Sequence, residues 1–289
     1  MNRRKFFKAA LATGSVGAFA GLAYGHDVEP HELSVERVHV TLKRLPQEFD
    51  GFTLALLSDF HYGNYVVPVL ASAIKQANAA SPDLALLAGD YVTSHDDGTK
   101  KLTEDADTCA QVLSQLRARC GVLAILGNHD YAPRPAIVLE SLHHHGIQLL
   151  RNNAFPVERN NSRLWIGGTD DVIKGKPDLD AAFKGAPQGD PKILLAHEPD
   201  FADAVSRKNL VDLQLSGHSH GGQVRLPLVG APVLPPMGEK YSMGLYRLNN
   251  MQLYTTRGLG MISPKVRFNC PPELTLLTLH SAASASSSR

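Results

Sequence analysis

Short hydrophobic runs recur along the chain, and most of them end in a polar or glycine-containing turn. Such a run, bounded by turn residues, is typical of a buried β-strand. The first run differs, because its apolar positions alternate as they do in a half-buried strand. Together the runs predict strands at 35–45, 52–58, 84–89, 121–126, 146–150, 155–158, 164–168, 192–196 and 213–216.

Between several of these runs, apolar residues recur at the three- and four-residue spacing of a helix. They predict helices at 69–79, 102–119, 136–145 and 201–207. Strands that alternate with helices indicate an α/β fold, with the first strands parallel and covered by helices.

The last part of the chain, from residue 223, has no convincing helical spacing. It predicts strands at 224–230, 244–248, 251–256, 265–268 and 273–279. This β-rich part suggests a second sheet packed on the first. Neither a linker nor an internal repeat divides the sequence, so residues 26–280 are predicted to form one domain. The tail 281–289, SAASASSSR, is predicted to be disordered.

Composition and charge exclude some classes of partner. The chain has 289 residues, enough for one large α/β domain, and a formal net charge of +1. No basic field points to nucleic acid, so no nucleic-acid partner is expected. Of three cysteines, Cys109 and Cys120 fall on one predicted helix, roughly 16 Å apart and too far to bridge. We therefore predict no disulfide framework.

The first 25 residues resemble a twin-arginine export signal. Arg3 and Arg4 open a basic stretch without acidic residues, and an apolar part follows that closes on the small residues 18–20. The alternative is an uncleaved membrane anchor, although the uncharged stretch 9–25 is shorter than the roughly 20 apolar residues of a span. We expect the twin-arginine machinery to export the protein to the periplasm or cell envelope, with retention at the membrane surface as the alternative.

Five predicted strands end in residues that bind metal ions. Ligands gather at the carboxyl ends of strands in open α/β sheets, so these residues are expected to converge on one edge. Each has an ordinary explanation as a cap or turn residue, and His218 and His220 alone would suit a solvated turn equally well. Five coincidences of strand end with ligand type favour a common site. The candidates are Asp59, His61, Asp90, Asn128, His129, His197, His218 and His220.

The donor types narrow the choice of metal. Carboxylates, imidazoles and one amide, without a thiolate, favour Mn²⁺, Fe or Zn²⁺ over a structural cysteine–zinc site. Seven ligands are too many for one ion and suit two. Two ions roughly 3.5–4 Å apart can clamp a phosphoryl group during in-line attack.

The order D-x-H, G-D, G-N-H-D, H, G-H-x-H resembles the calcineurin-like metallophosphoesterases. The stretches 221–236 and 255–277 are similar to the exported or membrane-associated bacterial phosphodiesterase branch of that superfamily (YkuE-like). The likeness covers nearly everything after residue 50. It implies an α/β fold of two packed mixed β-sheets flanked by helices, a four-layer α/β/β/α sandwich.

The resemblance also implies a role for each residue. Asp59, His61 and His220 would hold the first divalent cation, Asn128, His197 and His218 the second, and Asp90 would bridge them. A hydroxide between the metals would attack phosphorus. His129 would contact the phosphoryl oxygen or protonate the leaving group, and Asp130 would orient His129.

Three functions follow from these observations. The first is a dinuclear metallophosphoesterase that cleaves phosphodiester or pyrophosphate bonds of a small-molecule, lipid or cell-envelope substrate. Within that class, a UDP-2,3-diacylglucosamine-type pyrophosphatase of lipid A synthesis is an alternative, which would need an inward-facing protein. The other alternative is a non-catalytic envelope protein that binds phosphate groups. An amidohydrolase is disfavoured, because its HxH motif would come early in the chain.

Two weaker features complete the sequence. Arg257 could pair with a phosphate, since arginine binds phosphate oxygens bidentately. The run 143–145, three histidines, suggests a metal patch but falls at a predicted helix end, where cations complement the helix dipole.

Overall fold

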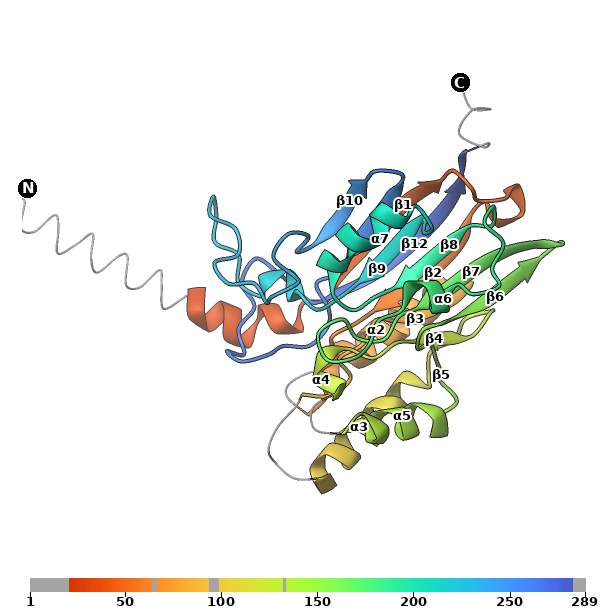
Figure 1. Ribbon diagram of the computed structural model, residues 1–289. Coiled ribbons are helices and arrows are strands. Elements are labelled where there is room, and N and C mark those ends of the chain that lie inside the picture. The colour runs from red at the N-terminus through yellow and green to blue at the C-terminus, as the bar shows by residue number, and fades with distance from the viewer. Residues whose placement is uncertain (1–20, 64–66, 94–98, 132–133, 283–289) are drawn as a thin grey trace, which may run out of the picture.

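Two six-stranded sheets lie face to face at the centre of the molecule (Figure 1). The computed structural model describes residues 21–63, 67–93, 99–131 and 134–282. The strand order in the first sheet is β1 (Ser34–Leu42), β12 (Glu273–Ser281), β2 (Phe52–Leu57), β3 (Leu84–Leu87), β4 (Val122–Ala124), β5 (Gln148–Leu149). In the second sheet it is β10 (Gly244–Leu248), β11 (Met251–Thr255), β9 (Leu213–Ser216), β8 (Lys192–Leu195), β7 (Ser162–Gly168), β6 (Asn153–Arg159).

Both sheets are mixed. Strands β2, β3, β4 and β5 run parallel, as predicted. The predicted first strand differs, because β1 pairs parallel with β12 and β12 pairs antiparallel with β2. In the second sheet β7, β8, β9 and β11 are parallel, and the edge strands β6 and β10 are antiparallel to their neighbours.

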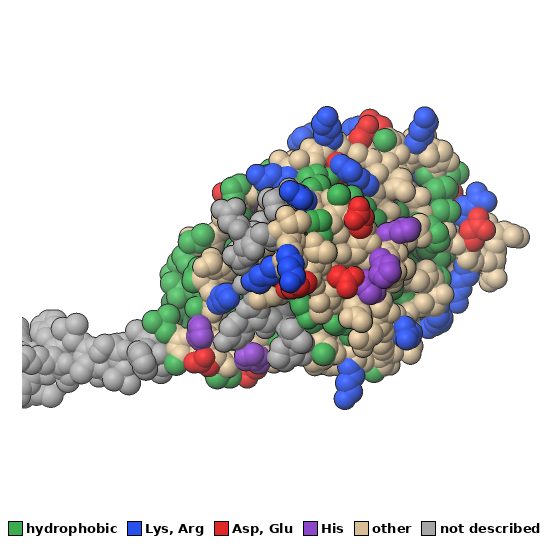
Figure 2. Space-filling view, turned by 90° about the horizontal axis from the view of Figure 1, so that it is seen from below, with side chains coloured by type: hydrophobic (Ala, Val, Ile, Leu, Met, Phe, Trp, Pro, Cys, Tyr) green, Lys and Arg blue, Asp and Glu red, His purple; other side chains and the backbone are tan. Residues whose placement is uncertain are grey.

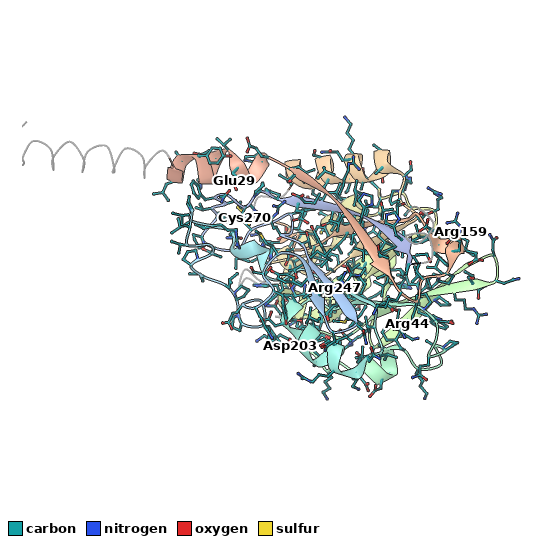
Figure 3. All side chains as sticks on the ribbon, turned by 90° about the horizontal axis from the view of Figure 1, so that it is seen from above. Glu29, Arg44, Arg159, Asp203, Arg247 and Cys270 are labelled. Atoms are coloured by element: carbon teal, nitrogen blue, oxygen red, sulfur yellow. The ribbon has the colours of Figure 1, made fainter. Side chains whose placement is uncertain are left out.

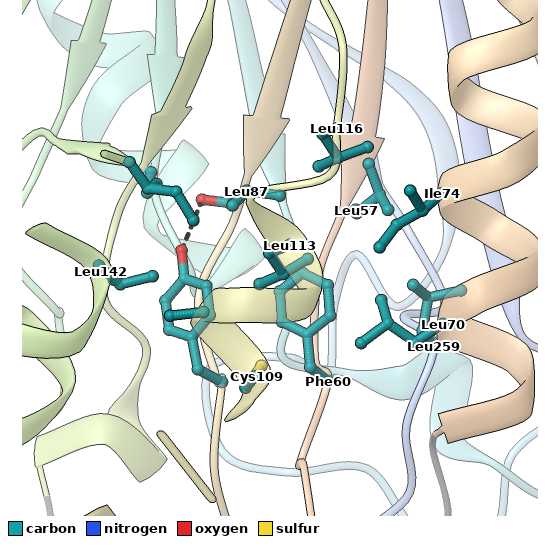
Figure 4. Packing of buried hydrophobic residues seen from close by; sticks show 14 of the residues in the cluster. Leu57, Phe60, Leu70, Ile74, Leu87, Cys109, Leu113, Leu116, Leu142 and Leu259 are labelled. Carbon is teal, nitrogen blue, oxygen red and sulfur yellow. Dashed lines mark hydrogen bonds between the residues drawn. The ribbon is translucent and has the colours of Figure 1, made fainter. Parts of the chain in front are cut away.

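Alternate side chains of each strand face opposite layers. In β2, Leu54 and Leu56 pack in the core between the sheets, whereas Ala55 and Leu57 pack under helices on the outer face. Figure 4 shows part of this helix–sheet packing around Leu57. The helices over the first sheet are α2 (Val67–Ala80), α3 (Thr99–Leu113) and α5 (Pro135–His144), and those over the second are α6 (Leu179–Ala182) and α7 (Ala202–Lys208). The predicted four-layer α/β/β/α sandwich is confirmed.

The predicted helix 102–119 is wrong in its last part, because α3 ends at Leu113. The Asn78 amide of α2 accepts a hydrogen bond from the Arg117 N–H and donates one to the Gln115 carbonyl oxygen, so the chain turns here. Cys120 consequently lies beyond the helix, in the turn before β4, and all three cysteines are free.

The last third of the chain also departs from the prediction. Residues 224–230 and 265–268 form loops that carry only isolated bridges, such as Val224 to Phe268, because Pro227 and the nearby Pro264 cannot donate to a ladder. The second sheet begins earlier than expected, with β6, and β12 returns to the first sheet. The pattern did not predict α6, α4 (Asn128–Tyr131) or the short 3₁₀ helices Glu29–His31, Gln47–Phe49, Pro199–Phe201 and His220–Gly222.

The N-terminal part of the described chain packs against the loop that precedes β12. Residues 21–27 are helical, and the Gly25 carbonyl oxygen accepts a hydrogen bond of 2.8 Å from the Arg267 N–H. The buried Glu29 carboxylate accepts from the N–H groups of Asn269 and Cys270, as the neighbouring positions of Glu29 and Cys270 in Figure 3 illustrate.

Both predicted terminal segments fall largely outside the described residues. Residues 1–20 of the predicted export signal and 283–289 of the predicted tail are among those not described. Within the described ranges, no helix has the length and apolarity that crossing a membrane requires.

Candidate metal centre

The candidate ligands come together at one end of the sandwich, but from both sheets. The prediction of a single sheet edge is wrong, because β2, β3 and β4 belong to the first sheet and β8 and β9 to the second. The two sets of strand ends contact each other directly. The His218 N–H donates to Asp59 Oδ1 at 2.9 Å, and His197 Nδ1 lies 2.6 Å from the Ala88 carbonyl oxygen.

The ligand atoms form two adjoining groups, in each of which they lie within 4.8 Å of one another. One group is Asp59, His61 and His220, and the other is Asp90, His197 and His218. All six side chains are buried.

Asp90 joins the two groups. Its Oδ2 lies 3.6 Å from His61 Nε2 and 3.1 Å from His197 Nε2. Asn128 Oδ1 lies 2.9 Å from His218 Nδ1 and so adjoins the second group. The seven residues predicted as ligands are thus together, and their assignment to particular ions remains a prediction.

Backbone carbonyls fix which nitrogen of two histidines can bind a metal. The Ala88 carbonyl accepts from His197 Nδ1, and the Pro236 carbonyl accepts from His218 Nε2 at 2.9 Å. The opposite nitrogens, His197 Nε2 and His218 Nδ1, are left as lone-pair donors that face Asp90 and Asn128. Such orientation of ligating histidines by an outer hydrogen bond is usual in metal sites.

Several buried polar atoms of the site have no hydrogen-bond partner. Among them are Asp59 Oδ2 and His197 Nε2, and at the centre of the first group His61 Nε2 and His220 Nε2 face each other at 3.0 Å. An unsatisfied buried polar group costs about 1–3 kcal/mol, so a cluster of them calls for a compensating ligand. Divalent cations would supply it, and the donor set of imidazoles, carboxylates and an amide suits them. The residues therefore fit a dinuclear metal centre.

Burial sets the protonation of the site. It lowers the pKa of His61 to about 3 and that of His218 to about 4, so both are neutral at neutral pH, as metal ligation requires. Burial likewise raises the pKa of Asp59 to about 6. Burial also opposes charge on Asp90 and on His197, but in the metal-free site each holds the other charged, so the pKa of Asp90 lies well below its ordinary value and that of His197 well above. A cation bound at His197 Nε2 would replace the proton there. The Asp90 carboxylate is thus the point where positive charge is most favoured.

Five of the candidate ligands have a left-handed backbone. The φ angles are 53° at Asp59, 46° at His61, 56° at Asp90, 68° at His218 and 50° at His220. Non-glycine residues adopt such angles infrequently, and strained residues cluster at functional sites. The sharp turns at the strand ends are what bring side chains two positions apart toward one centre.

A loop from the far end of the chain supports Asp59. A Cβ on Gly258 would lie 2.6 Å from Asp59 Cβ, so only glycine permits this approach. The fully buried Arg267 holds the loop, because its Nη2 donates to the carbonyl oxygens of Arg257, Gly258 and Gly260. Sequence reasoning missed Gly258 and Arg267, and no local signal marks them.

His129 and Asp130 lie beside the candidate metal ligands. The His129 N–H donates to Asp90 Oδ1 at 2.8 Å, and its half-buried ring meets the His61 ring edge-on, with centroids 4.9 Å apart. The Asp130 carboxylate accepts from the N–H groups of Asp90, Tyr91 and Gly127. Asp130 thus holds together the turns after β3 and β4, and its orientation of His129 remains a prediction.

The two weaker sequence features lie elsewhere. Arg257 is not available to a phosphate as we predicted, because its guanidinium pairs with Glu273 at 2.8 Å and with Glu36 at 2.6 Å. In the histidine run at the end of α5, His145 Nε2 contacts Asp107 of α3 at 2.9 Å.

Comparison with known proteins places this geometry in a family. The calcineurin-like phosphoesterase family matches residues 52–222. The chain is 34% identical to the uncharacterized metallophosphoesterase YkuE of Bacillus subtilis, over 97% of this chain and 98% of that protein. It is 33% identical to the phosphodiesterase YaeI of Escherichia coli, over 96% of this chain and 99% of that protein.

Among solved structures, a sulfate thiohydrolase of Thermus thermophilus, SoxB, has a similar fold. The TM-score is 0.52 at 14% identity, over 82% of this chain and 57% of that one. At this identity the likeness concerns the fold alone.

Proposed function

This chain belongs to the calcineurin-like phosphoesterase family and is a hydrolase of phosphoester bonds, and we propose that it cleaves phosphodiester or pyrophosphate bonds at a dinuclear metal centre. The single observation that carries the proposal is the pair of adjoining ligand groups joined by Asp90. Asp59, His61 and His220 would hold one divalent cation, and Asn128, His197 and His218 the other, with Asp90 shared.

Two such cations would lower the pKa of a water nucleophile and offset the charge of the phosphoryl group. The protein's own residues then decide access and proton transfer. Asn128 adds a neutral donor, so the site does not gain another negative charge where an anionic phosphate must approach. His129 is half-buried beside Asp90, where it can contact a phosphoryl oxygen or donate a proton to the leaving group.

Preference for a diester is supported by the relative in Escherichia coli, whose name is phosphodiesterase. The test uses metal-stripped protein with added Mn²⁺, Zn²⁺, Fe²⁺ or Mg²⁺. Its substrates are a chromogenic phosphodiester, the matching monoester and a UDP-sugar as the pyrophosphate. We expect metal-dependent turnover of the diester or the UDP-sugar that exceeds turnover of the monoester. Faster hydrolysis of the monoester with every metal would contradict the proposal.

Two variants separate metal binding from proton transfer. Asp90→Asn should lose both metal and turnover. His129→Asn should keep two metal ions per chain, yet lose about 10²–10⁴-fold in kcat on a diester with an alkyl leaving group. Its loss should be smaller with a nitrophenolate, which leaves without a proton. Equal losses for both leaving groups would refute a role for His129 as the acid.

We further propose export by the twin-arginine route, with the domain starting at residue 21 rather than at 26. The hydrogen bond between Gly25 and Arg267 supports this boundary, since a cut after residue 25 would break it. Cleavage after Ala20 would leave the helix 21–27 in place. Sequencing the amino terminus of protein from the cell envelope tests the idea, and a start at residue 26 would refute it.

A further inference from the structure

The loop between the metal centre and β10 carries an unusual stretch of apolar residues. Residues 226–236, LPLVGAPVLPP, contain no polar side chain, and we call them the apolar loop. Leu228 at its tip is fully exposed, and Val229 and Val233 are 71% and 74% exposed. Exposed hydrophobic clusters of this kind mark interaction sites, because water disfavours them.

Most backbone N–H groups at the tip of the apolar loop are hydrogen-bonded. Of the residues 226–230, Pro227 has no N–H, and the N–H groups of Leu226, Val229 and Gly230 all donate within the turn. Three further prolines follow at positions 232, 235 and 236. A segment that enters hydrocarbon must satisfy its backbone internally, and this tip largely does so.

The root of the apolar loop rests on the metal centre. The Pro236 carbonyl oxygen accepts the hydrogen bond from His218 Nε2, and a Cβ on Gly222 would lie 2.4 Å from Ala231 Cβ. Leu228 precedes Pro236 by eight residues, so the tip can lie no more than about 29 Å from this hydrogen bond. A surface that held the tip would therefore lie within that distance of the metal centre.

The same end of the molecule carries a second apolar feature. The helix 21–27 and the turn after it expose Leu22, Tyr24 and Val28, and Figure 2 shows hydrophobic side chains at the end where the described chain begins. This helix contacts Arg267, and the next residue, Phe268, accepts a hydrogen bond from the Arg225 N–H at the root of the loop. The helix and the loop are thus linked through one short segment.

We propose that the apolar loop and residues 21–28 insert together into the boundary between headgroups and acyl chains of a bilayer. We favour a bilayer over a second protein copy because the segment before the helix, with Arg3, Arg4 and an uncharged stretch from residue 9, would bring the chain to a membrane during export, before cleavage after Ala20. Two weak anchors side by side give stable membrane binding where one gives only transient contact.

The proposal names the substrate class as well. A metal centre held at the headgroup layer would act on a phosphoester of a membrane lipid. This part rests on the proposed function, whereas insertion of the loop does not.

Tryptophan fluorescence tests insertion directly, because Trp165 is the one native tryptophan in the sequence. Full-length protein with Leu228→Trp is mixed with vesicles of equal parts phosphatidylethanolamine and phosphatidylglycerol. We expect a blue shift absent from the parent protein, and quenching by brominated lipid in the same vesicles. An unchanged spectrum in protein that sediments with the vesicles would overturn the proposal, since binding would then occur without the loop.

Turnover tests the substrate class. The variant Leu228→Ser with Val229→Ser is compared with Ile173→Ser, which removes an exposed aliphatic side chain from a different loop. On a soluble chromogenic diester, both should equal the parent. On phosphatidylglycerol in vesicles, the double variant should be slower by about tenfold or more, and Ile173→Ser unchanged.

The outcomes separate the two proposals. If the parent protein hydrolyses no diester at all, the proposed function fails while the tryptophan result still decides insertion. If it hydrolyses the soluble diester but no vesicle lipid, or if the double variant matches the parent on vesicles, the lipid substrate is refuted.

Discussion

A methyl group at Gly258 has no room beside Asp59. A Cβ there would lie 2.6 Å from Asp59 Cβ and 2.7 Å from Oδ2. Neither partner can move alone, because the His218 N–H holds Asp59 Oδ1 and Arg267 holds the Gly258 loop. Gly258→Ala should therefore displace the Asp59 carboxylate from the first metal.

The magnitude has two parts. The φ of +67° at Gly258 puts alanine in the left-handed region, which costs about 1–2 kcal/mol. The collision adds about 1–3 kcal/mol, the usual range for an overpacked core. We expect Gly258→Ala to lower the free energy of unfolding by about 2–5 kcal/mol. Disturbing a support of a metal ligand should also weaken metal affinity by about 10–100-fold.

Gly51 offers a matched control. Its φ is +79°, and a Cβ there would meet nothing within 4 Å. Gly51→Ala should show the left-handed strain alone, with metal content and activity unchanged.

The assay combines urea denaturation with metal analysis and turnover of the chromogenic diester. Gly258→Ala should bind one metal ion tightly instead of two and turn over slowly at limiting metal, with partial recovery in excess Mn²⁺. Metal content and kcat equal to those of Gly51→Ala would refute the argument that this glycine positions Asp59.

Three further predictions concern stability, pH and metal. Asp130→Asn should lower the free energy of unfolding, measured by urea denaturation, by about 1–3 kcal/mol, because one amide oxygen cannot replace a carboxylate that serves four N–H groups; His129→Asn should leave this free energy unchanged. In metal-free protein, burial lowers the pKa of His218 from 6.5 to about 4. As the pH falls below 6.5, the unfolded state therefore binds a proton that the folded state does not. The free energy of unfolding decreases as a result, by about 2 kcal/mol at pH 5. His218→Asn should flatten this fall in denaturation curves at several pH values, and an unaltered slope would count against it. Chelation should abolish turnover and lower the melting temperature, and Mn²⁺ in large excess over its Kd should restore on the order of 3 kcal/mol.

The sequence was sufficient to predict that the candidate ligands lie close together, because topology relates the local pattern of a strand to its place in the fold. Each candidate ligand follows a short apolar run that predicts a strand. The carboxyl ends of neighbouring parallel strands lie at one end of a sheet, so this local pattern alone places the ligands near one another. The division of those strands between two sheets could not be predicted in the same way. The run before His197 and the run before Asp90 look alike, and only long-range pairing with β9 or with β2 decides their sheet.

Contacts between distant segments explain the other differences. Helix α3 ends at Leu113, and this end depends on Asn78, which lies 35 residues earlier in the chain. The helical spacing of residues 114–119 gives no indication of the hydrogen bonds that the Asn78 amide makes there. Gly258 and Arg267 likewise act on Asp59 from the far end of the chain, where the local sequence shows only a loop.

The left-handed backbone of the candidate ligands indicates what holds the candidate metal centre in shape. Asp59, Asp90 and His218 lie in a strained region of the backbone, which persists only where the surroundings over-determine it. The surroundings here are hydrogen bonds of the protein itself. The Asp90 carbonyl accepts from the N–H groups of Phe60 and His61, and the Asp130 carboxylate accepts from the Asp90 N–H.

None of these bonds needs a metal ion, so the strain is offset within the polypeptide. Among the described residues, buried atoms without a partner, such as Asp59 Oδ2 and His197 Nε2, are what bound cations would satisfy. The fold by itself thus sets the backbone of the candidate site, to which cations would then bind. Metal removal should therefore leave the two sheets intact and lower stability by the binding free energy alone, a result that circular dichroism of the chelated protein can check. Loss of secondary structure on chelation would show instead that the ions hold the turns in their left-handed form.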